Sequence, residues 1–252
     1  MIKCSVALLL LFAGSQPLEA QVYGGSIDEI DIPNVNGPLV EFAFWTDLDQ
    51  DGDEDIVGIT SGVEVVVMMG PDFMPRGIGS GDFDNVVPLG DIDGDGWLDI
   101  VASVPRYSGS SGYEGKVTVF SSKTGLVLHE SVGSDGFGAA VLQVHDLDGD
   151  GLEDFVFIWG QYTQPYRDWQ GFLRATSSVS GSTSWEVPFG NLSAHDQPWV
   201  VDNIGDSDGD GHPDMLIGCA EEASNSTNSG GPYPGAVHVL SSSDGTPLLR
   251  IQ

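Results

Sequence analysis

Four short segments of the chain share one pattern of carboxylate residues. Each has Asp at positions 1, 3, 5 and 9 and Gly at position 6, and we number them loop 1 (47–55), loop 2 (91–99), loop 3 (146–154) and loop 4 (206–214). Calcium takes about six to eight oxygen ligands, and alternate side chains of a tight loop can point toward one centre. Glycine at position 6 permits the sharp turn, because a positive φ costs it little. The spacing therefore predicts a calcium-binding loop in each segment.

The predicted ligands are the carboxylates at positions 1, 3, 5 and 9 and the backbone carbonyl at position 7, whose side chain is free to vary. By loop they are Asp47, Asp49, Asp51, Asp53 and Asp55; Asp91, Asp93, Asp95, Trp97 and Asp99; Asp146, Asp148, Asp150, Leu152 and Asp154; and Asp206, Asp208, Asp210, His212 and Asp214. A single match of this kind is also typical of an acidic, solvated turn. Four copies that all keep position 9 favour four structural Ca²⁺ sites.

These loops differ from EF-hand loops in the residues that come after position 9. An EF-hand has a bidentate Glu at position 12 and a helix on either side. Position 12 is here occupied by Gly58, Ala102, Phe157 and Ile217, and none of these side chains can bind a cation. Short apolar runs of strand-forming residues come directly after position 9. We therefore expect each loop to connect two β-strands.

The first 20 residues have the pattern of a secretory signal peptide. One positive charge, Lys3, precedes an apolar core over residues 6–13, and two cleavage points are available, after Ser15 and after Ala20. The core is too short to span a bilayer, and no later segment is long and apolar enough. The alternative is a first β-strand of the mature chain. Residues 21–252 then form the secreted region, in which the one remaining cysteine, Cys219, cannot make an internal disulfide.

The composition is strongly acidic. The chain has 38 Asp and Glu residues against 8 Lys and Arg residues, which gives a net charge of −30. Half of these carboxylates, 19 of the 38, lie in the four loops. A surface of this charge repels nucleic acid and anionic membranes, so neither is an expected partner. Simple solubility or adaptation to salty surroundings is the alternative explanation of the charge.

More than the loop repeats along the chain. The loops begin 44 to 60 residues apart, and an apolar stretch precedes each of them, at residues 40–45, 86–89, 139–144 and 199–204. A strand and an irregular segment come next, and the last three repeats end in a hairpin with a Gly-ended turn (117–125, 172–181 and 237–245). This period predicts an all-β fold, a β-propeller with one blade per repeat, at roughly 37–82, 83–133, 134–192 and 193–252.

The repeat resembles the FG-GAP repeat of the integrin α-subunit propeller and of many secreted bacterial propellers. In that family an apolar Phe-Gly strand leads into a DxDxDGxxD loop and a further strand. Phe137-Gly138 before loop 3 is the best match and Phe83 stands before loop 2, whereas repeats 1 and 4 keep the loop without a Phe-Gly pair. The resemblance implies Ca²⁺ at the matching Asp positions. Because integrin-type propellers are seven-bladed, four repeats imply either an incomplete arc of a longer propeller or a ring that closes with few blades.

We predict a secreted, calcium-binding adhesion or ligand-binding module whose partner is an extracellular protein or glycan. Aromatic residues of the irregular segments, such as Tyr107, Tyr113, Trp159, Trp169 and Tyr233, would either bind a glycan in a lectin-like manner or pack between blades. A further alternative is a non-catalytic propeller part of a larger secreted enzyme. Catalysis by the chain itself is not expected, because it has no G-x-S-x-G nucleophile elbow and the loops account for most carboxylate pairs.

Overall fold

The computed structural model of the chain describes residues 39–60, 64–70, 74–109, 112–134, 136–163, 168–192, 198–219 and 236–251. Within these ranges every regular element is a β-strand, and the strands form four antiparallel sheets. Each sheet is a meander of four strands in sequence order. The predicted signal peptide and Tyr233 lie outside the described residues. Among the described residues there is no helix long and apolar enough to cross a membrane.

Each sheet is one blade. Blade 1 consists of β1 (Leu39–Thr46), β2 (Asp55–Thr60), β3 (Glu64–Met69) and β4 (Met74–Ser80). Blade 2 consists of β5 (Asn85–Pro88), β6 (Ile100–Gly109), β7 (Gly112–Phe120) and β8 (Val127–Ser134). Blade 3 consists of β9 (Ala140–Val144), β10 (Asp154–Thr163), β11 (Asp168–Thr176) and β12 (Thr183–Leu192). Blade 4 consists of β13 (Pro198–Gly205), β14 (Asp214–Cys219), β15 (Ala236–Leu240) and β16 (Pro247–Ile251).

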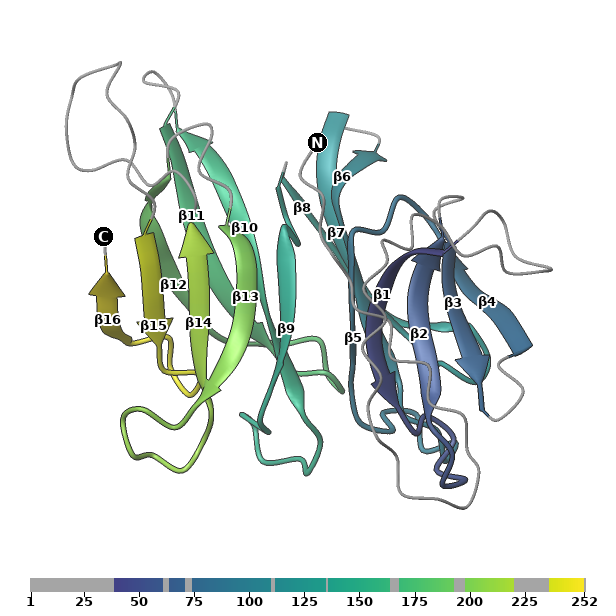
Figure 1. Cartoon of the computed structure of the whole chain (residues 1–252). Coiled ribbons are helices and arrows are strands. Elements are labelled where there is room, and N and C mark those ends of the chain that lie inside the picture. The colour runs from purple at the N-terminus through teal and green to yellow at the C-terminus, as the bar shows by residue number, and fades with distance from the viewer. Residues whose placement is uncertain are drawn as a thin grey trace, which may run out of the picture.

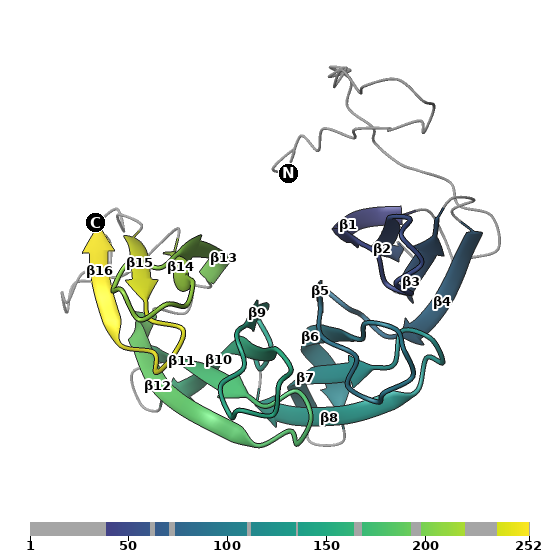
Figure 2. The same cartoon turned by 90° about the horizontal axis from the view of Figure 1, so that it is seen from below.

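The blades follow one another around an open arc, with the first strand of each blade innermost and the fourth at the outer rim (Figure 2). The inner strands touch in sequence, because β1 contacts β5, β5 contacts β9 and β9 contacts β13. Blades 1 and 4 stand at the two ends of the arc (Figure 2). This radial arrangement of four-stranded meanders confirms the predicted propeller-type, all-β fold class.

Apolar side chains fill each junction between consecutive blades. Strand residues alternate between the two faces of a sheet, so a blade that packs on both sides carries apolar residues at most positions. The clusters at the three junctions include Val57, Val67 and Ile100 for blades 1 and 2; Val101, Val119 and Phe155 for blades 2 and 3; and Val156, Leu173 and Met215 for blades 3 and 4. Each fully buried side chain of this kind contributes about 1.5–3 kcal/mol. The junctions therefore hold the arc together.

The Phe-Gly pair docks a blade onto the one before it. Phe137 is buried in the cluster between blades 2 and 3. Gly138 has φ +81°, and a Cβ atom there would lie 2.9 Å from Cγ2 of Val117 in blade 2, so a larger residue would force the two blades apart. Phe83 has the same place between blades 1 and 2, where its ring meets that of Phe120 edge-on at a centroid distance of 5.7 Å.

The prediction of an irregular segment after the second strand of blades 2 and 3 was wrong for most of its residues. β6 and β7 stay paired out to Gly109 and Gly112, with Tyr107 opposite Glu114. β10 and β11 stay paired with Tyr162 opposite Trp169. Tyr, Trp and Thr favour strands, and antiparallel pairing satisfies their backbone polar groups. The predicted aromatic loops of these two blades are thus largely long hairpins.

Candidate metal centre

Each of loops 1–4 connects the first two strands of a blade, and all four lie at the lower end of the molecule in Figure 1. Strand pairing fixes the two ends of a loop against each other. In blade 1 Thr46, which precedes position 1, pairs with Asp55 at position 9, and in blade 4 Gly205 pairs with Asp214 in the same way. The register therefore brings the first and last predicted ligands to one place.

Inside each loop, backbone N–H groups donate to the carboxylates at positions 1, 3 and 5. In loop 2, Asp91 accepts from the N–H groups of Asp95 and Gly96, at 3.0 Å and 2.8 Å. Asp93 accepts from Asp95 at 3.1 Å, and Asp95 accepts from Trp97 at 3.0 Å. The same bonds recur in loops 1 and 3, and in loop 4 the first carboxylate takes the N–H of position 4 in place of position 5. These bonds hold the carboxylates in fixed orientations.

The position-9 carboxylate connects the loop to a second turn of the blade. Asp154 is fully buried, and its Oδ2 accepts the N–H of Leu147 in loop 3 at 2.9 Å. Its Oδ1 accepts the N–H of Ser178, in the turn between β11 and β12, at 3.0 Å. Asp55 and Asp99 make the corresponding pairs of bonds in blades 1 and 2. The carboxylate thereby holds the loop against the turn.

Loop 4 departs from this pattern at position 9. Oδ2 of Asp214 accepts the N–H of Ser207 at 2.6 Å, as its counterparts do. Its Oδ1 is buried and has no hydrogen-bond partner. In the neighbouring turn the hydroxyl of Ser242 donates to the carbonyl of Pro213 at 2.7 Å. A buried carboxylate oxygen without a donor costs free energy unless a cation satisfies it.

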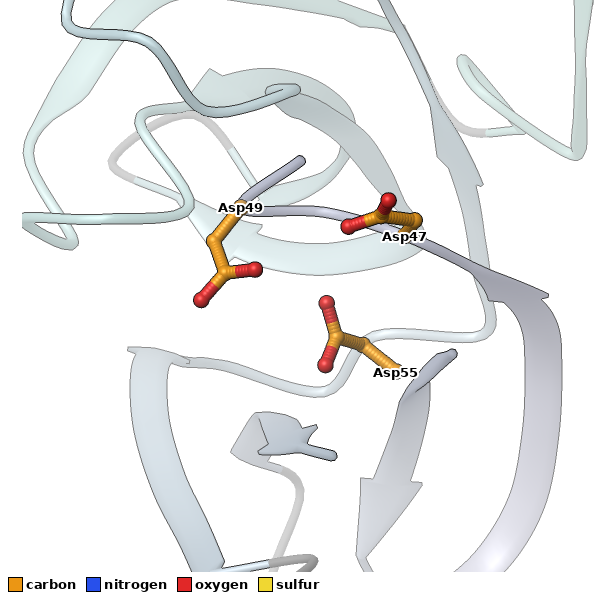
Figure 3. A group of neighbouring side chains, drawn as sticks. All are labelled: Asp47, Asp49 and Asp55. Atoms are coloured by element: carbon orange, nitrogen blue, oxygen red, sulfur yellow. The ribbon is translucent and has the colours of Figure 1, made fainter. Parts of the chain in front are cut away.

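Three carboxylates converge in every loop. One oxygen from each of positions 1, 3 and 9 lies within 4.8 Å of the others in loops 1–3, whereas positions 1, 3 and 5 converge in loop 4. In loop 1 the side chains of Asp47, Asp49 and Asp55 surround a common space (Figure 3). The structure places the fourth predicted carboxylate of each loop outside these groups, namely Asp51, Asp95, Asp150 and Asp214.

Two positions of each loop have a left-handed backbone. Position 6 is Gly in every loop, with φ between 90° and 96°. Position 4 also has a positive φ, and there loops 2–4 have Gly94, Gly149 and Gly209 while loop 1 has Gln50 at 60°. Gln50 is the one non-glycine residue with positive φ among the described residues. The glycine at position 4 is therefore a second signal of the loop in the sequence, which the predicted ligand pattern does not include.

The position-7 side chains, which were predicted to be free to vary, have partners of their own in loops 2 and 4. Two cations lie over the ring of Trp97, namely the guanidinium of Arg76 from blade 1 at 5.2 Å and the ammonium of Lys123 at 5.6 Å from the ring centroid. Lys123 also donates to the backbone carbonyl of Asp95 at 2.6 Å. Sequence reasoning missed Arg76 and Lys123, because they come from β4 and from the turn after β7, far from loop 2 along the chain.

His212 of loop 4 stacks on His145, which precedes loop 3, with ring centroids 3.6 Å apart. Burial and the neighbouring His212 lower the pKa of His145, and its Nδ1 lies 3.2 Å from the hydroxyl of Ser242. The hydroxyl of Ser243 donates to Asp210 at 2.5 Å and lowers the pKa of that carboxyl. The segments at loops 3 and 4 therefore touch across the junction of their blades.

Position 7 of loops 1 and 3 is occupied by Asp53 and Leu152. The backbone N–H group of each donates a hydrogen bond to the carboxylate at position 5 of the same loop.

Burial raises the pKa of the position-9 carboxyl in two of the four loops. Burial raises the pKa of Asp99 from 3.8 to about 6, although three backbone donors, Ile92, Ser122 and Asp93, oppose the rise. Burial likewise raises the pKa of Asp154, again opposed by backbone donors. At position 1 of loop 3 the opposite holds, because the N–H of Gly151 lowers the pKa of Asp146. A buried carboxyl held among other carboxylates gains from a nearby cation.

One repeat of the chain matches a known family, and the whole chain has a distant structural neighbour. Residues 83–120, from the buried phenylalanine at 83 through loop 2 to the end of β7, match the model of the FG-GAP repeat. No curated protein matches the chain. Among solved structures the chain is similar to a mutant of the apocarotenoid oxygenase of Synechocystis, at 13% sequence identity and a TM-score of 0.37. The match covers 92% of this chain and 52% of that one, so the chain spans about half the length of the oxygenase structure.

Proposed function

We propose that this FG-GAP repeat propeller binds one calcium ion in each of its four loops and that the ions stabilise the blades. The observation that carries the proposal is the convergence of three carboxylate oxygens within 4.8 Å in every loop. Two oxygens bound to the same Ca²⁺ are at most about 5 Å apart, since each Ca–O distance is about 2.3–2.6 Å. The donor set consists of oxygen alone, which suits a hard cation.

The loop geometry indicates which residues would hold the ion. In loops 1–3 these are the three converging carboxylates at positions 1, 3 and 9, and in loop 4 they are those at positions 1, 3 and 5. The buried, unpartnered Oδ1 of Asp214 is a further oxygen available in loop 4. When bound, the ion would supply positive charge to a group of carboxylates that otherwise repel one another. The backbone N–H groups of the loop keep those carboxylates in place for it.

The role proposed for the metal is structural. Position 9 already connects the loop to the turn between the third and fourth strands in blades 1–3. An ion on that carboxylate would therefore fix the loop between the first and second strands of a blade against the turn between its third and fourth strands. Binding to the folded chain alone stabilises it by RT ln(1 + [Ca]/Kd), about 2.7 kcal/mol per site at a hundredfold excess over Kd.

The proposal places the module outside the cell, where calcium is abundant and weak sites fill. The pattern of residues 1–20 supports secretion, and the net charge of −30 argues against nucleic acid as a partner. We assign the module to adhesion or ligand binding, with an extracellular protein or glycan as its ligand. We do not assign a reaction to it.

A lectin-like function receives less support from the described aromatic residues. The ring of Trp159 stacks on Phe172 at a centroid distance of 4.5 Å, and its Nε1 donates to Glu186 at 3.2 Å. The guanidinium of Arg174 lies 5.4 Å from the same ring and binds Glu186. Trp159 is thus held within blade 3 by its own neighbours, which favours packing over sugar stacking for this residue.

Thermal unfolding with calcium and with an excess of chelator tests the proposal. The melting temperature should rise when calcium replaces the chelator, and the rise should shrink in Asp146→Asn, which loses one carboxylate of loop 3. Asp82→Asn is the matched control, because Asp82 is an exposed carboxylate outside the loops and should leave the rise unchanged. A melting temperature that is the same in calcium and chelator would remove the proposed function.

A further inference from the structure

The strand register gives one equivalent residue on the outer strand of each of the first three blades. Each stands in the same row as position 11 of its loop, on the face that packs against the following blade. We call these the rim residues, and they are Arg76 on β4, His129 on β8 and Trp185 on β12. They differ in type, but each side chain can carry an N–H group.

A turn of the following blade lies beside each rim residue. These turns, at 121–125, 177–181 and 241–245, connect the third and fourth strands of blades 2, 3 and 4. Each is closed by the same bond, from the N–H of its glycine to the carbonyl of its first serine, at 2.8–2.9 Å. A Cβ atom at Gly181 would lie 3.5 Å from Nδ1 of His129, and one at Gly245 would lie 2.9 Å from the ring of Trp185. The three turns are therefore alike, and the rim residue beside them differs.

Two of the rim residues form hydrogen bonds with the turn. The guanidinium of Arg76 donates to the carbonyls of Ser122 and Lys123, at the second and third positions of the turn in blade 2. Nε2 of His129 forms a hydrogen bond with the carbonyl of Val179, at the third position of the turn in blade 3. Because a carbonyl only accepts, Nε2 of His129 carries the proton and donates it. Both residues thus hold the backbone of a turn across a blade junction.

The third rim residue, Trp185, makes no such bond. Its Nε1 is buried and has no hydrogen-bond partner among the described residues. An indole N–H can only donate, and a buried donor without an acceptor costs free energy. The ring therefore packs against the turn of blade 4 without holding its carbonyls.

The position-9 carboxylates divide the same three blades in the same way. Where the rim residue holds the turn, the second residue of the turn donates its N–H to position 9. Ser122 donates to Asp99 at 3.2 Å, and Ser178 donates to Asp154 at 3.0 Å. In blade 4, Oδ1 of Asp214 has no donor within the described part of the chain. Position 9 converges with positions 1 and 3 in loops 2 and 3 but not in loop 4.

We propose that the rim residue of one blade is a positioning residue for the calcium site of the next blade. A side-chain donor there holds the turn, the turn offers its N–H to the position-9 carboxylate, and this bond keeps the carboxylate beside positions 1 and 3. Arg76 does this for loop 2 and His129 for loop 3, whereas Trp185 leaves loop 4 without the bond. The inference rests on the proposed function, because it concerns the same four loops.

Loop 3 provides the cleanest test, because the rim residue of loop 2 is a cation beside the loop. His129→Leu removes the donor, and His129→Gln keeps an N–H group on a side chain of similar reach. In chelator, the amide proton of Ser178 should exchange with deuterium about fivefold faster in His129→Leu, as expected for the loss of one hydrogen bond. It should exchange at the wild-type rate in His129→Gln. NMR spectroscopy measures this rate in the absence of metal.

Calcium titrations of the full chain then follow each loop separately. The amide resonance of the glycine at position 6 reports its own loop, because this N–H donates to position 1. The Kd read at Gly151 in loop 3 should rise about fivefold in His129→Leu, and the Kd read at Gly96 in loop 2 should not change. In an Asp154→Asn background, His129→Leu should cause no further loss, since the rim residue acts through that carboxylate. Ser131→Ala, on the same face of β8, is the matched control and should leave both values unchanged.

Blade 4 offers the opposite experiment. Trp185→His places at the rim of blade 3 the donor that blade 2 has in His129. Loop 4, read at Gly211, should then bind calcium about fivefold more tightly, because the turn would be held and could offer its N–H to Asp214. A gain of affinity cannot come from damage to the fold, and circular dichroism checks that the variant folds.

Two kinds of failure are distinguishable. If no loop of the wild-type chain binds calcium, the proposed function and this inference both fall. If the loops bind calcium but the Kd of loop 3 is the same in His129→Leu as in the wild type, only this inference falls. A further loss from His129→Leu on top of Asp154→Asn overturns it as well, and so does a folded Trp185→His whose loop 4 binds calcium no more tightly.

Discussion

Loops 3 and 4 share a sequence pattern and lie in adjacent blades, yet they differ at position 9. Asp154 in loop 3 satisfies both of its oxygens with backbone N–H groups, one from the loop and one from the Ser178 turn. Asp214 in loop 4 satisfies one oxygen and leaves the other buried without a partner. The pattern of carboxylates is therefore not sufficient for the geometry of the loop. A donor from a second turn decides whether position 9 is held without metal.

The largest expected effect comes from replacing the position-9 carboxylate of loop 3, and the same change in loop 4 is its comparison. Asp154→Asn should destabilise the metal-free protein by about 2 kcal/mol, because the amide group turns a donor toward an N–H and leaves it unpaired. Asp214→Asn should be close to neutral, since its amide nitrogen can point to the side where Oδ1 has no donor now. Denaturant unfolding in chelator measures both. Equal losses in the two variants would contradict the assigned hydrogen bonds.

The position-9 carboxyl of loop 2, Asp99, should make the stability of the protein depend on pH. The pKa of Asp99 is about 6 in the folded, metal-free protein and 3.8 in the ordinary case, so folding favours the protonated form. The stability that this group contributes is present below about pH 4 and is lost as the pH rises through about 6. In chelator, wild-type stability should fall relative to Asp99→Asn over this range. A difference between the two proteins that does not change with pH would show that Asp99 titrates normally.

The backbone of position 4 gives a smaller effect. Gln50→Gly should stabilise loop 1 by about 0.5–1 kcal/mol, because a left-handed conformation costs a non-glycine residue about 1–2 kcal/mol and glycine loses part of this gain in unfolded-state entropy. Gly149→Gln in loop 3 should destabilise by a similar amount. Denaturant unfolding midpoints at constant m-value measure both changes. Opposite signs in the two variants are the expected result, and equal signs would be inconsistent with it.

The smallest expected effect concerns the charge beside loop 2. Lys123 lies 4.0 Å from Oδ1 of Asp95, and loop 4 has Ser243 in the corresponding turn position. Under the calcium proposal, Lys123→Ser should tighten cation binding in loop 2 by about threefold, since a unit charge roughly 6 Å from a divalent ion in water is worth about 1.4 kcal/mol and about 0.1 M salt roughly halves this energy. Terbium luminescence excited through Trp97 reports this loop. Val179→Ser, at the same turn position of blade 3, is the control and should leave that signal unchanged.

The sequence predicted the repeat unit well because the unit is local. Strands, loops and turns recur within one blade, and the Asp and Gly spacing from Asp91 to Asp99 is enough to predict a tight acidic turn. The confirmed fold class is a consequence of that repeat. The predictions of bound calcium, secretion and ligand binding stay predictions.

The sequence did not predict the contacts between segments that are far apart along the chain. The Ser178 and Ser122 donors of position 9, and the cations around Trp97, come from turns and blades that no spacing within the loop specifies. The extended hairpins after the second strand were missed because Gly, Ser and Pro in these segments suggested turns. Strand pairing over aromatic residues outweighed that local preference.

The most direct test of the calcium proposal is a count of bound metal. The purified chain, dialysed to equilibrium against calcium and then analysed for metal and protein content, should contain four calcium ions per chain above the dialysis buffer. The variants Asp146→Asn and Asp206→Asn should each lower this number by one. A folded chain that holds no calcium above the buffer at millimolar free calcium would contradict the proposal.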